Sequence, residues 1–482
     1  MIALLSSPRR APRGRVVGLI MGLVALTLAS PGVTYALVLE GALAPTDAPL
    51  GCVHDSGSSV PGSERCGQAV AGLSRPGGLA VSPDGRHLYV VGQDSDSVVA
   101  LARSPHGSLR SPGRPSSQGC VQGEGPRVCS TVDRGLGGVD ALAVSPDGRY
   151  VYVGSLDRAS VTALARHRNG RLTGLRGAGR CLQGNPGLGE PRHACPRHLS
   201  ALTGVVAVAV SPDGRNVYAL SSDPQTARSA VVGLRRSRRN GGLGALAGRG
   251  GCVGSARAGA CSVSAPGLRG AAALTISPDG RFVYVASALS SAVTVLVRHP
   301  GSGRLRPLPG AGGCLIEAGI PPSPSDRGCQ WTAGGLGGAR ALALSANGRQ
   351  LYVGAFDPGS VAVLTRNRLT GRLASSAAPG TCLAAAAEAG CSAVPELRGT
   401  VDLDARPDGR AVYVSAQGAN ALISLGRDPA SGTLATDSSG PRSLAAFNAP
   451  GRMVIGPGGR QLYLGSPVDD AVVALSLPPG RP

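Results

Sequence analysis

Short runs in which apolar and polar residues alternate follow one another along most of the chain, and turn-forming residues separate them. Alternation with a period of two is typical of a β-strand with one buried face. A representative stretch predicts strands at Val139–Ser145, Tyr150–Gly154, Ser160–Ala165 and Arg171–Leu175. Pro146-Asp147-Gly148 supplies a tight turn after the first, because Pro presets φ, Asp bonds its own backbone and Gly accepts a positive φ. The pattern predicts an antiparallel four-stranded unit.

This unit is repeated along the chain. The tetrapeptide Ser82-Pro83-Asp84-Gly85 returns at Ser145, Ser211 and Ser277, and weaker copies begin at Ser345, Arg406 and Gly456. Successive copies begin 61 to 68 residues apart, except that the last follows after 50. A Tyr stands seven residues after the start of every copy, and we interpret it as a packing residue between units: Tyr89, Tyr152, Tyr218, Tyr284, Tyr352, Tyr413 and Tyr463.

Seven repeats of four strands predict an all-β chain folded as a seven-bladed β-propeller, with one four-stranded blade for each repeat. A β-helix would need much shorter repeats, and a sandwich would not repeat. The last repeat ends near Leu477 after its third strand. Leu43, however, precedes Cys52 by nine residues, as the strand-four leucines precede the later cysteines. We therefore expect an N-terminal strand near Gly41–Ala44 to complete the last blade and close the ring.

The N-terminal residues have the features of an export signal. Arg9, Arg10, Arg13 and Arg15 precede an apolar run from Val16 to Ala29, and small residues follow it. We expect residues 1–36 to be a signal peptide and residues 37–482 to form a single propeller domain, secreted or held in the cell envelope. Arg9-Arg10 leaves twin-arginine export open as an alternative route. No long apolar run follows, so the mature chain is not expected to be an integral membrane protein.

The twelve cysteines fall into six neighbouring pairs, each between the fourth strand of one unit and the first strand of the next. Export favours their oxidation, and the repeat favours pairing within each loop. A zinc site is the weaker alternative, because no Cys-x2-Cys occurs and His193 and His198 near Cys195 form an isolated cluster. The predicted disulfides are Cys52–Cys66, Cys120–Cys129, Cys181–Cys195, Cys252–Cys261, Cys314–Cys329 and Cys382–Cys391.

The turn sequence Ser-Pro-Asp-Gly-Arg followed by Val-Tyr-Val, as at Val151-Tyr152-Val153 and Val283-Tyr284-Val285, resembles YVTN-type propellers and the lactonase, or 6-phosphogluconolactonase-like, family. The resemblance spans about residues 41–478. It implies a seven-bladed propeller that in some members hydrolyses sugar lactones. The motifs specify blade construction rather than chemistry. The export signal and the regular cysteine pairs are departures from the family's pattern, and they argue against a cytosolic role.

The chain is strongly basic, with a formal net charge of +20, and all 48 basic residues are Arg. This one-sided usage also fits genome composition. Aromatic residues make up 3% of the chain, too few for base-stacking recognition of nucleic acid. Two sets of Arg on the same face, one right after the first turn and one at the start of the second turn, are expected to form two positive rings that contact an anionic envelope polymer: Arg86, Arg149, Arg215, Arg281, Arg349, Arg410 and Arg460, then Arg103, Arg166, Arg236, Arg298, Arg366 and Arg427.

Candidate chemistry lies on the opposite face, around the central channel. Asp94, Asp157, Asp223 and Asp357 share one position in the loop after the second strand. Converging carboxylates could bind a ligand, but an Asp in a tight loop also caps its own backbone, and the repetition favours this structural role. Asp140 and Arg340 break the repeat just before the first strand, which makes them the better candidates for catalysis at the channel mouth.

No Gly-x-Ser-x-Gly, His-Glu-x-x-His or phosphate-binding loop occurs in the chain. The sequence therefore favours a secreted or envelope binding module that uses its loop face for a protein, an envelope glycan or an anionic polymer. The alternative is a lactonase-type carboxylic ester hydrolase acting on sugar lactones at the channel mouth. We expect a monomer without cofactor, metal or specific nucleic-acid partner.

Overall fold

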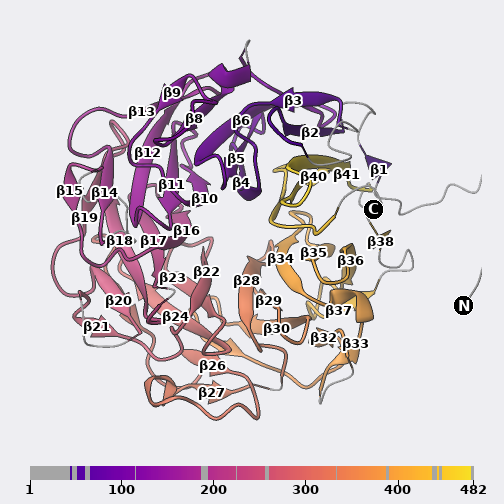
Figure 1. The fold of residues 1–482 in the computed structure, drawn as a ribbon. Coiled ribbons are helices and arrows are strands. Elements are labelled where there is room, and N and C mark those ends of the chain that lie inside the picture. The colour runs from indigo at the N-terminus through magenta and orange to yellow at the C-terminus, as the bar shows by residue number, and fades with distance from the viewer. Residues whose placement is uncertain are drawn as a thin grey trace, which may run out of the picture. The chain divides into compact units, whose positions relative to one another are not determined.

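Seven mainly antiparallel sheets follow one another around a common axis, each forming one blade of a β-propeller (Figure 1). The computed structural model describes residues 44–45, 51–59, 66–113, 116–185, 194–223, 225–255, 260–332, 334–386, 390–436, 442–443 and 448–478. The expected signal peptide, residues 1–36, and Leu43 lie outside these residues. Within them, no helix is long and apolar enough to cross a membrane. The all-β, seven-bladed fold predicted from the repeats is confirmed.

The strands of the blades are as follows. Blade one contains β4 (Pro76–Val81), β5 (His87–Gly92), β6 (Ser97–Arg103), β7 (Leu109–Arg110), β8 (Cys120–Gln122) and β9 (Thr131–Val132). Blade two contains β10 (Val139–Val144), β11 (Tyr150–Ser155), β12 (Ser160–Arg166), β13 (Leu172–Gly174), β14 (Cys181–Gln183) and β15 (Arg197–His198). Blade three contains β16 (Val205–Val210), β17 (Asn216–Ser222), β18 (Ser229–Arg236), β19 (Leu243–Ala245), β20 (Cys252–Gly254) and β21 (Val263–Ser264).

Blade four contains β22 (Ala271–Ile276), β23 (Phe282–Ser287), β24 (Ala292–Arg298), β25 (Leu305–Pro307), β26 (Cys314–Ile316) and β27 (Gln330–Trp331). Blade five contains β28 (Ala339–Leu344), β29 (Gln350–Ala355), β30 (Ser360–Arg366), β31 (Leu373–Ala374), β32 (Cys382–Ala384) and β33 (Ser392–Ala393). Blade six contains β34 (Thr400–Ala405), β35 (Ala411–Ala416), β36 (Ala421–Arg427), β37 (Leu434–Thr436) and β38 (Arg442–Ser443). Short 3₁₀ helices occupy Ser116–Gly119, Pro324–Asp326 and Pro395–Leu397.

The prediction of four strands per blade was too low, because six sheets have six strands and blade six has five. In blade two, the fourth position is divided between two short strands. β13 pairs with the end of β12, and β14 pairs with its beginning. β15 then adds a parallel strand outside β14. The extra strands arise where the cysteine-containing loop returns along the sheet edge, and they cover an edge that would otherwise be exposed.

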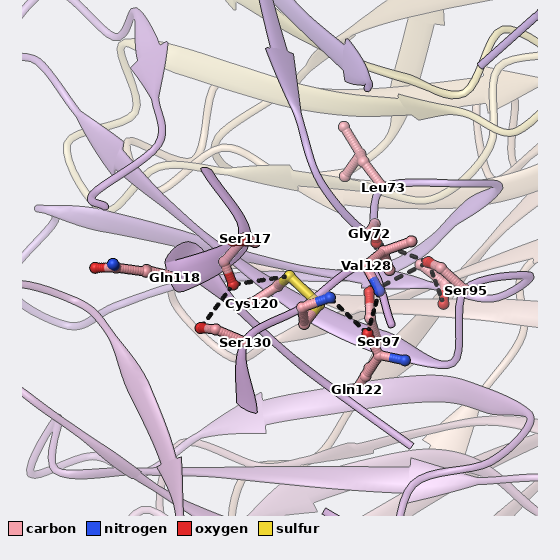
Figure 2. The surroundings of a disulfide bond; sticks show 12 residues. Gly72, Leu73, Ser95, Ser97, Ser117, Gln118, Cys120, Gln122, Val128 and Ser130 are labelled. Atoms are coloured by element: carbon pink, nitrogen blue, oxygen red, sulfur yellow. Dashed lines mark hydrogen bonds between the residues drawn. A yellow bond between two sulfur atoms is a disulfide. The ribbon is translucent and has the colours of Figure 1, made fainter. Parts of the chain in front are cut away.

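All six predicted disulfides are present, and the described residues contain no free cysteine. Figure 2 shows the surroundings of Cys120–Cys129 on blade one. The Gln122 Oε1 atom accepts the backbone N–H groups of Val128 and Cys129 at 2.8 and 2.5 Å, which fixes the return of the loop. Gly72, with φ +81°, packs against both sulfur atoms, so a side chain at this position would collide with the bridge.

Blade seven combines strands from both ends of the described chain. β39 (Met453–Ile455), β40 (Gln461–Ser466) and β41 (Ala471–Ser476) come from the C-terminal end, and β1 (Ala44–Pro45), β2 (Cys52–Asp55) and β3 (Gln68–Val70) join them. β41 pairs with both β1 and β2, in the registers Ala44↔Ser476 and Cys52↔Val473. That this ladder holds the ring closed stays a prediction, which the Discussion develops.

Neighbouring blades are joined by a repeated contact among Tyr, Arg and Asp. The Arg236 side chain on β18 donates to the Tyr152 hydroxyl at 2.7 Å and to the Asp147 carboxylate at 2.6 Å, both on the preceding blade. It also donates to the Gly214 carbonyl of its own blade at 2.8 Å. Tyr152 in turn donates to the Gly241 carbonyl of blade three at 2.9 Å. The reading of the repeated Tyr as inter-blade packing is confirmed.

This contact overturns the expectation of a second positive ring. Arg236, Arg298, Arg366 and Arg427 are buried, and all six members of the set bind the Tyr of the preceding blade: Arg103, Arg166, Arg236, Arg298, Arg366 and Arg427. Four of them also pair with a turn Asp of that blade. Buried ion pairs leave no charge for a surface partner. The first set, headed by Arg86, is exposed as expected.

The joint between blades six and seven is built differently. Leu477 stands where the other blades have the Arg, and Ser443 stands where they have the first Cys. Here Asp402 and Asp404 on β34 accept the backbone N–H groups of Met453 and Ile455 on β39, each at 2.8 Å. Two carboxylates therefore link the inner strands across this joint.

Candidate functional site

The innermost strands of the blades carry small apolar residues with a few charged exceptions. β10 and β28 each have a β-bulge directly after their first residue, and Asp140 and Arg340 occupy the bulged positions. A bulge turns the extra side chain out of the regular alternation, and bulges are common next to active sites. The two residues that the sequence singled out therefore share one structural position on blades two and five.

Asp140 lines a cavity of about 150 Å³ at the centre of the propeller, together with Asp402 and Arg452. Asp402 lies on β34, and Arg452 immediately precedes β39. Apolar side chains from β4, β10 and β16 complete the wall, among them Leu79, Leu142 and Val208. The structure thus brings two carboxylates and a guanidinium from three blades into one half-buried pocket.

Burial raises the pKa of Asp140 above its usual value. Three interactions oppose this rise: the positive charge of Arg452, the hydrogen bond from Gln93, and the positive charge of Arg75. The carboxyl group is therefore both desolvated and close to positive charge. The Gln93 side-chain amide donates to Asp140 Oδ1 at 2.5 Å and fixes its orientation. A carboxylate held in this way is a better proton acceptor than one in water.

Asp402 and Asp404 are the other perturbed acids of the inner wall. Burial raises the pKa of Asp402, while Arg452 and the backbone N–H group of Met453 lower it. Burial raises the pKa of Asp404 to about 7, and the nearby charge of Asp402 adds to the rise. Acids that retain a proton near neutral pH can act as proton donors.

Arg340 approaches the same region from blade five. Its guanidinium stacks over the Phe356 ring, 4.4 Å from the ring centroid. Burial lowers its pKa, and the positive charge of Arg452 lowers it further, whereas Asp357 raises it. Two partly buried Arg side chains close enough for one to lower the pKa of the other form a favourable place for an anion or a developing oxyanion.

Sequence reasoning missed Asp402, Asp404, Arg452 and Gln93. A signal was present for three of them, because Asp404 is also a charge at a repeat position, two before the first turn residue, that is uncharged in the other blades. Four residues before the first turn residue, the repeats carry Gly or Ala in blades one, two, three, four and five, but Asp402 in blade six and Arg452 in blade seven. Aligning the repeats at this position would have shown two opposite charges on adjacent blades.

The four repeated Asp residues do not converge. Asp94 is exposed and pairs with Arg75 at 3.6 Å. Asp157 and Asp357 are exposed, and each lies against the Gly that opens its own blade, Gly138 and Gly338. Their loops belong to separate blades, and the geometry gives them no common ligand.

Asp223 has a different role. Its carboxylate accepts the backbone N–H of Gln225 at 2.9 Å and the hydroxyl of Thr226 at 2.6 Å, which is the capping role weighed above. Among the residues that the structure describes, no group of three or more His, Cys, Asp or Glu side chains is arranged to hold a metal ion. The two carboxyl groups and the guanidinium of the central pocket can transfer protons and stabilise an anion.

No protein-family profile and no curated protein matches the chain. Among solved structures, the periplasmic gluconolactonase of Pseudomonas aeruginosa is similar, with a TM-score of 0.51, 22% identity and an alignment covering 79% of this chain and 89% of that chain. The fold is shared with a gluconolactonase. This supports, at the level of the fold, the resemblance to lactonase-like propellers.

Two other similar structures have different descriptions. The β-propeller domain of Myceliophteria thermophila Cps50 (Swd1) gives a TM-score of 0.51, 11% identity and coverage of 84% of this chain and 96% of that one. Kuenenia stuttgartiensis hydrazine synthase gives a TM-score of 0.50 and 14% identity, and the alignment covers 87% of this chain and 98% of that one. Because one fold carries such different proteins, the activity has to be argued from the central pocket.

Proposed function

We propose that the protein is a lactonase-like hydrolase that opens sugar lactones at the mouth of the central channel. The observation that carries the proposal is the grouping of Asp140, Asp402 and Arg452 in one half-buried cavity, with both carboxyl groups raised in pKa. Lactone opening needs a base, an acid and a positive group for the oxyanion, and these three residues supply that set. The gluconolactonase among the structural neighbours is consistent with this assignment.

The reaction can be followed atom by atom. Asp140 accepts a proton from water as the water oxygen attacks the lactone carbonyl carbon. Arg452 stabilises the negative charge that develops on the carbonyl oxygen. The ring C–O bond then breaks, and the carboxyl group of Asp402, whose pKa is raised by burial, donates a proton to the leaving alkoxide, which gives the open hydroxy acid. Transfer of a proton from Asp140 to Asp402 through water restores both groups for the next turnover. Arg340 is placed to attract the carboxylate product or a polar substituent of the sugar.

A binding or scaffold module is the second candidate function, and the exposed set of Arg residues after the first turn of each blade, headed by Arg86, favours it. The two functions use different parts of the molecule, so they can be separated. Six disulfides and a periplasmic structural neighbour fit an extracellular or envelope location for either one.

The deciding experiment is hydrolysis of a panel of γ- and δ-sugar lactones by the purified protein, corrected for spontaneous opening. We expect Asp140→Asn, Asp402→Asn and Arg452→Gln each to lower kcat by about a hundredfold or more. The matched control is Asp223→Asn, which changes a loop-capping carboxylate that does not line the central cavity and should retain full activity. The rate should fall as pH decreases through the raised pKa of Asp140, because the base must be ionised. Wild-type protein with no turnover above background would exclude the lactonase and leave the binding module.

A further inference from the structure

The positive charge of the chain is concentrated in one stretch. Residues 176–306 contain seventeen Arg but four acidic residues. Three of the four acids are already engaged, because Asp213 and Asp279 pair with buried Arg residues and Asp223 caps its own loop. This part of blades two, three and four therefore has a large excess of Arg without a carboxylate partner.

Two grooves in this region occupy the same position of the repeat. Each lies where the loop before a disulfide meets the fourth strand of the next blade. The Leu243 N–H donates to the Gly179 carbonyl at the joint between blades two and three, and the Leu305 N–H donates to the Gly250 carbonyl at the next joint, both at 2.8 Å. The volumes of the grooves are about 490 and 670 Å³.

Arg side chains line both grooves. In the first, Arg197 of blade two and Arg235 of blade three approach Gly244, where an added Cβ would lie 3.3 and 3.9 Å from their guanidinium nitrogens. In the second, Arg249 and Arg306 lie among the apolar side chains of Val263, Val297 and Leu305. These four Arg residues are exposed, and none forms an ion pair with another described residue.

We propose that these two consecutive grooves bind a linear acidic polysaccharide whose sugar residues carry carboxylate or sulfate groups. Arg binds such groups through paired N–H donors, and two equivalent grooves one blade apart suit a repeating ligand better than a single ion. The apolar side chains of the second groove suit the C–H faces of sugar rings. Nucleic acid is disfavoured, since no Phe, Tyr or Trp lines either groove among the described residues, and His299 in the second groove is the one ring there on which a base could stack.

This site differs from the double Arg ring expected from sequence. Arg236 borders the first groove but is buried in its contact with Tyr152 and Asp147. Replacing it would disrupt the joint between blades as well as the charge. A variant that tests binding must therefore leave Arg236 in place.

The test is the affinity of the intact mature protein for a fluorescent oligogalacturonate, measured across a salt gradient. The rim variant replaces Arg197, Arg235, Arg249 and Arg306 with Ser. The matched variant replaces Arg86, Arg349, Arg410 and Arg460 with Ser, which removes the same charge from exposed positions outside the grooves. Thermal melting of both variants establishes that each is folded.

We expect the rim variant to lose at least tenfold in affinity and the matched variant to lose less than threefold, with weaker binding at higher salt. A neutral dextran should not bind. Equal losses in the two variants would show that only net charge matters, and absence of binding at low salt would remove the site; both outcomes overturn the proposal. Rim-dependent binding of duplex DNA with equal or higher affinity would assign the grooves to nucleic acid and also overturn it.

Discussion

Asp404 is the residue at which burial and ionisation oppose each other most strongly. Its pKa is about 7, against an ordinary value of 3.8, and burial is the principal cause. Because the folded chain holds this proton more tightly than the unfolded chain, protonated Asp404 stabilises the fold. That stability is fully present below about pH 4 and is lost as pH rises through about 7.

Replacing Asp404 with Asn should remove this pH dependence. The amide oxygen can still accept the Ile455 N–H, but the position no longer carries a charge. We expect the melting temperature of Asp404→Asn to exceed that of the wild type by several degrees above pH 7, and the difference to vanish near pH 4. Melting curves at intervals from pH 4 to 8 measure this. A difference that is constant over that range would contradict the raised pKa.

Single residues also show where sequence reasoning stopped. Asp140 and Arg340 were found because each is a charge at an otherwise uncharged position of the repeat. Asp402 and Arg452 obey the same rule at the neighbouring position, yet their meaning comes from the cavity that they share with Asp140 of blade two, which is distant from both in the sequence. Gln93 was not predictable, because an uncharged side chain in a loop gives no signal until its partner, Asp140, is placed beside it.

The strand is the scale at which the repeat is most informative. The strands of blade two were predicted to within about one residue, because alternation and turn residues are local properties. The short strands that contain or follow the cysteines were not predicted, since they have no alternation of their own and form only when β12 offers an open edge. The Arg residues at the ends of the third strands were misplaced for a related reason, because an Arg at the end of a strand gives no sequence signal for its partner on the preceding blade.

Removing one of these buried Arg residues should destabilise the joint that it spans. Arg236→Met leaves the Asp147 carboxylate and the Tyr152 hydroxyl without their donor, and we expect a loss of about 2–4 kcal/mol in the free energy of unfolding. Arg215→Met, at an exposed turn position of the same blade, should cost less than about 0.5 kcal/mol. Urea denaturation of both variants gives the comparison. Equal costs would mean that the buried contact contributes no more than a surface Arg.

Six joints of the ring carry the contact between Arg and Tyr, and the joint between blades six and seven has Leu477 in place of the Arg. The joints between blades are therefore not all stabilised by the same contact. Its seventh sheet depends on strands from opposite ends of the chain, next to the joint that lacks the repeated contact. Stability of the whole molecule should accordingly be most sensitive to changes in this sheet, where few local contacts compensate for a lost strand.

Deletion of residues 37–50 tests whether the N-terminal ladder holds the ring. The deletion removes β1, which pairs with β41 at Ala44↔Ser476, and the segment that leads into β2. It leaves the end of β41 without its partner, and the open edge exposes backbone groups that were bonded. We expect the melting temperature to fall by about 10 °C or more and the transition to broaden as blade seven separates from the rest. The control is deletion of residues 37–39, which keeps β1 and its pairing with β41 and should leave the melting curve unchanged. If both truncated proteins have the same melting temperature as the intact mature chain, contacts between blades alone hold the ring.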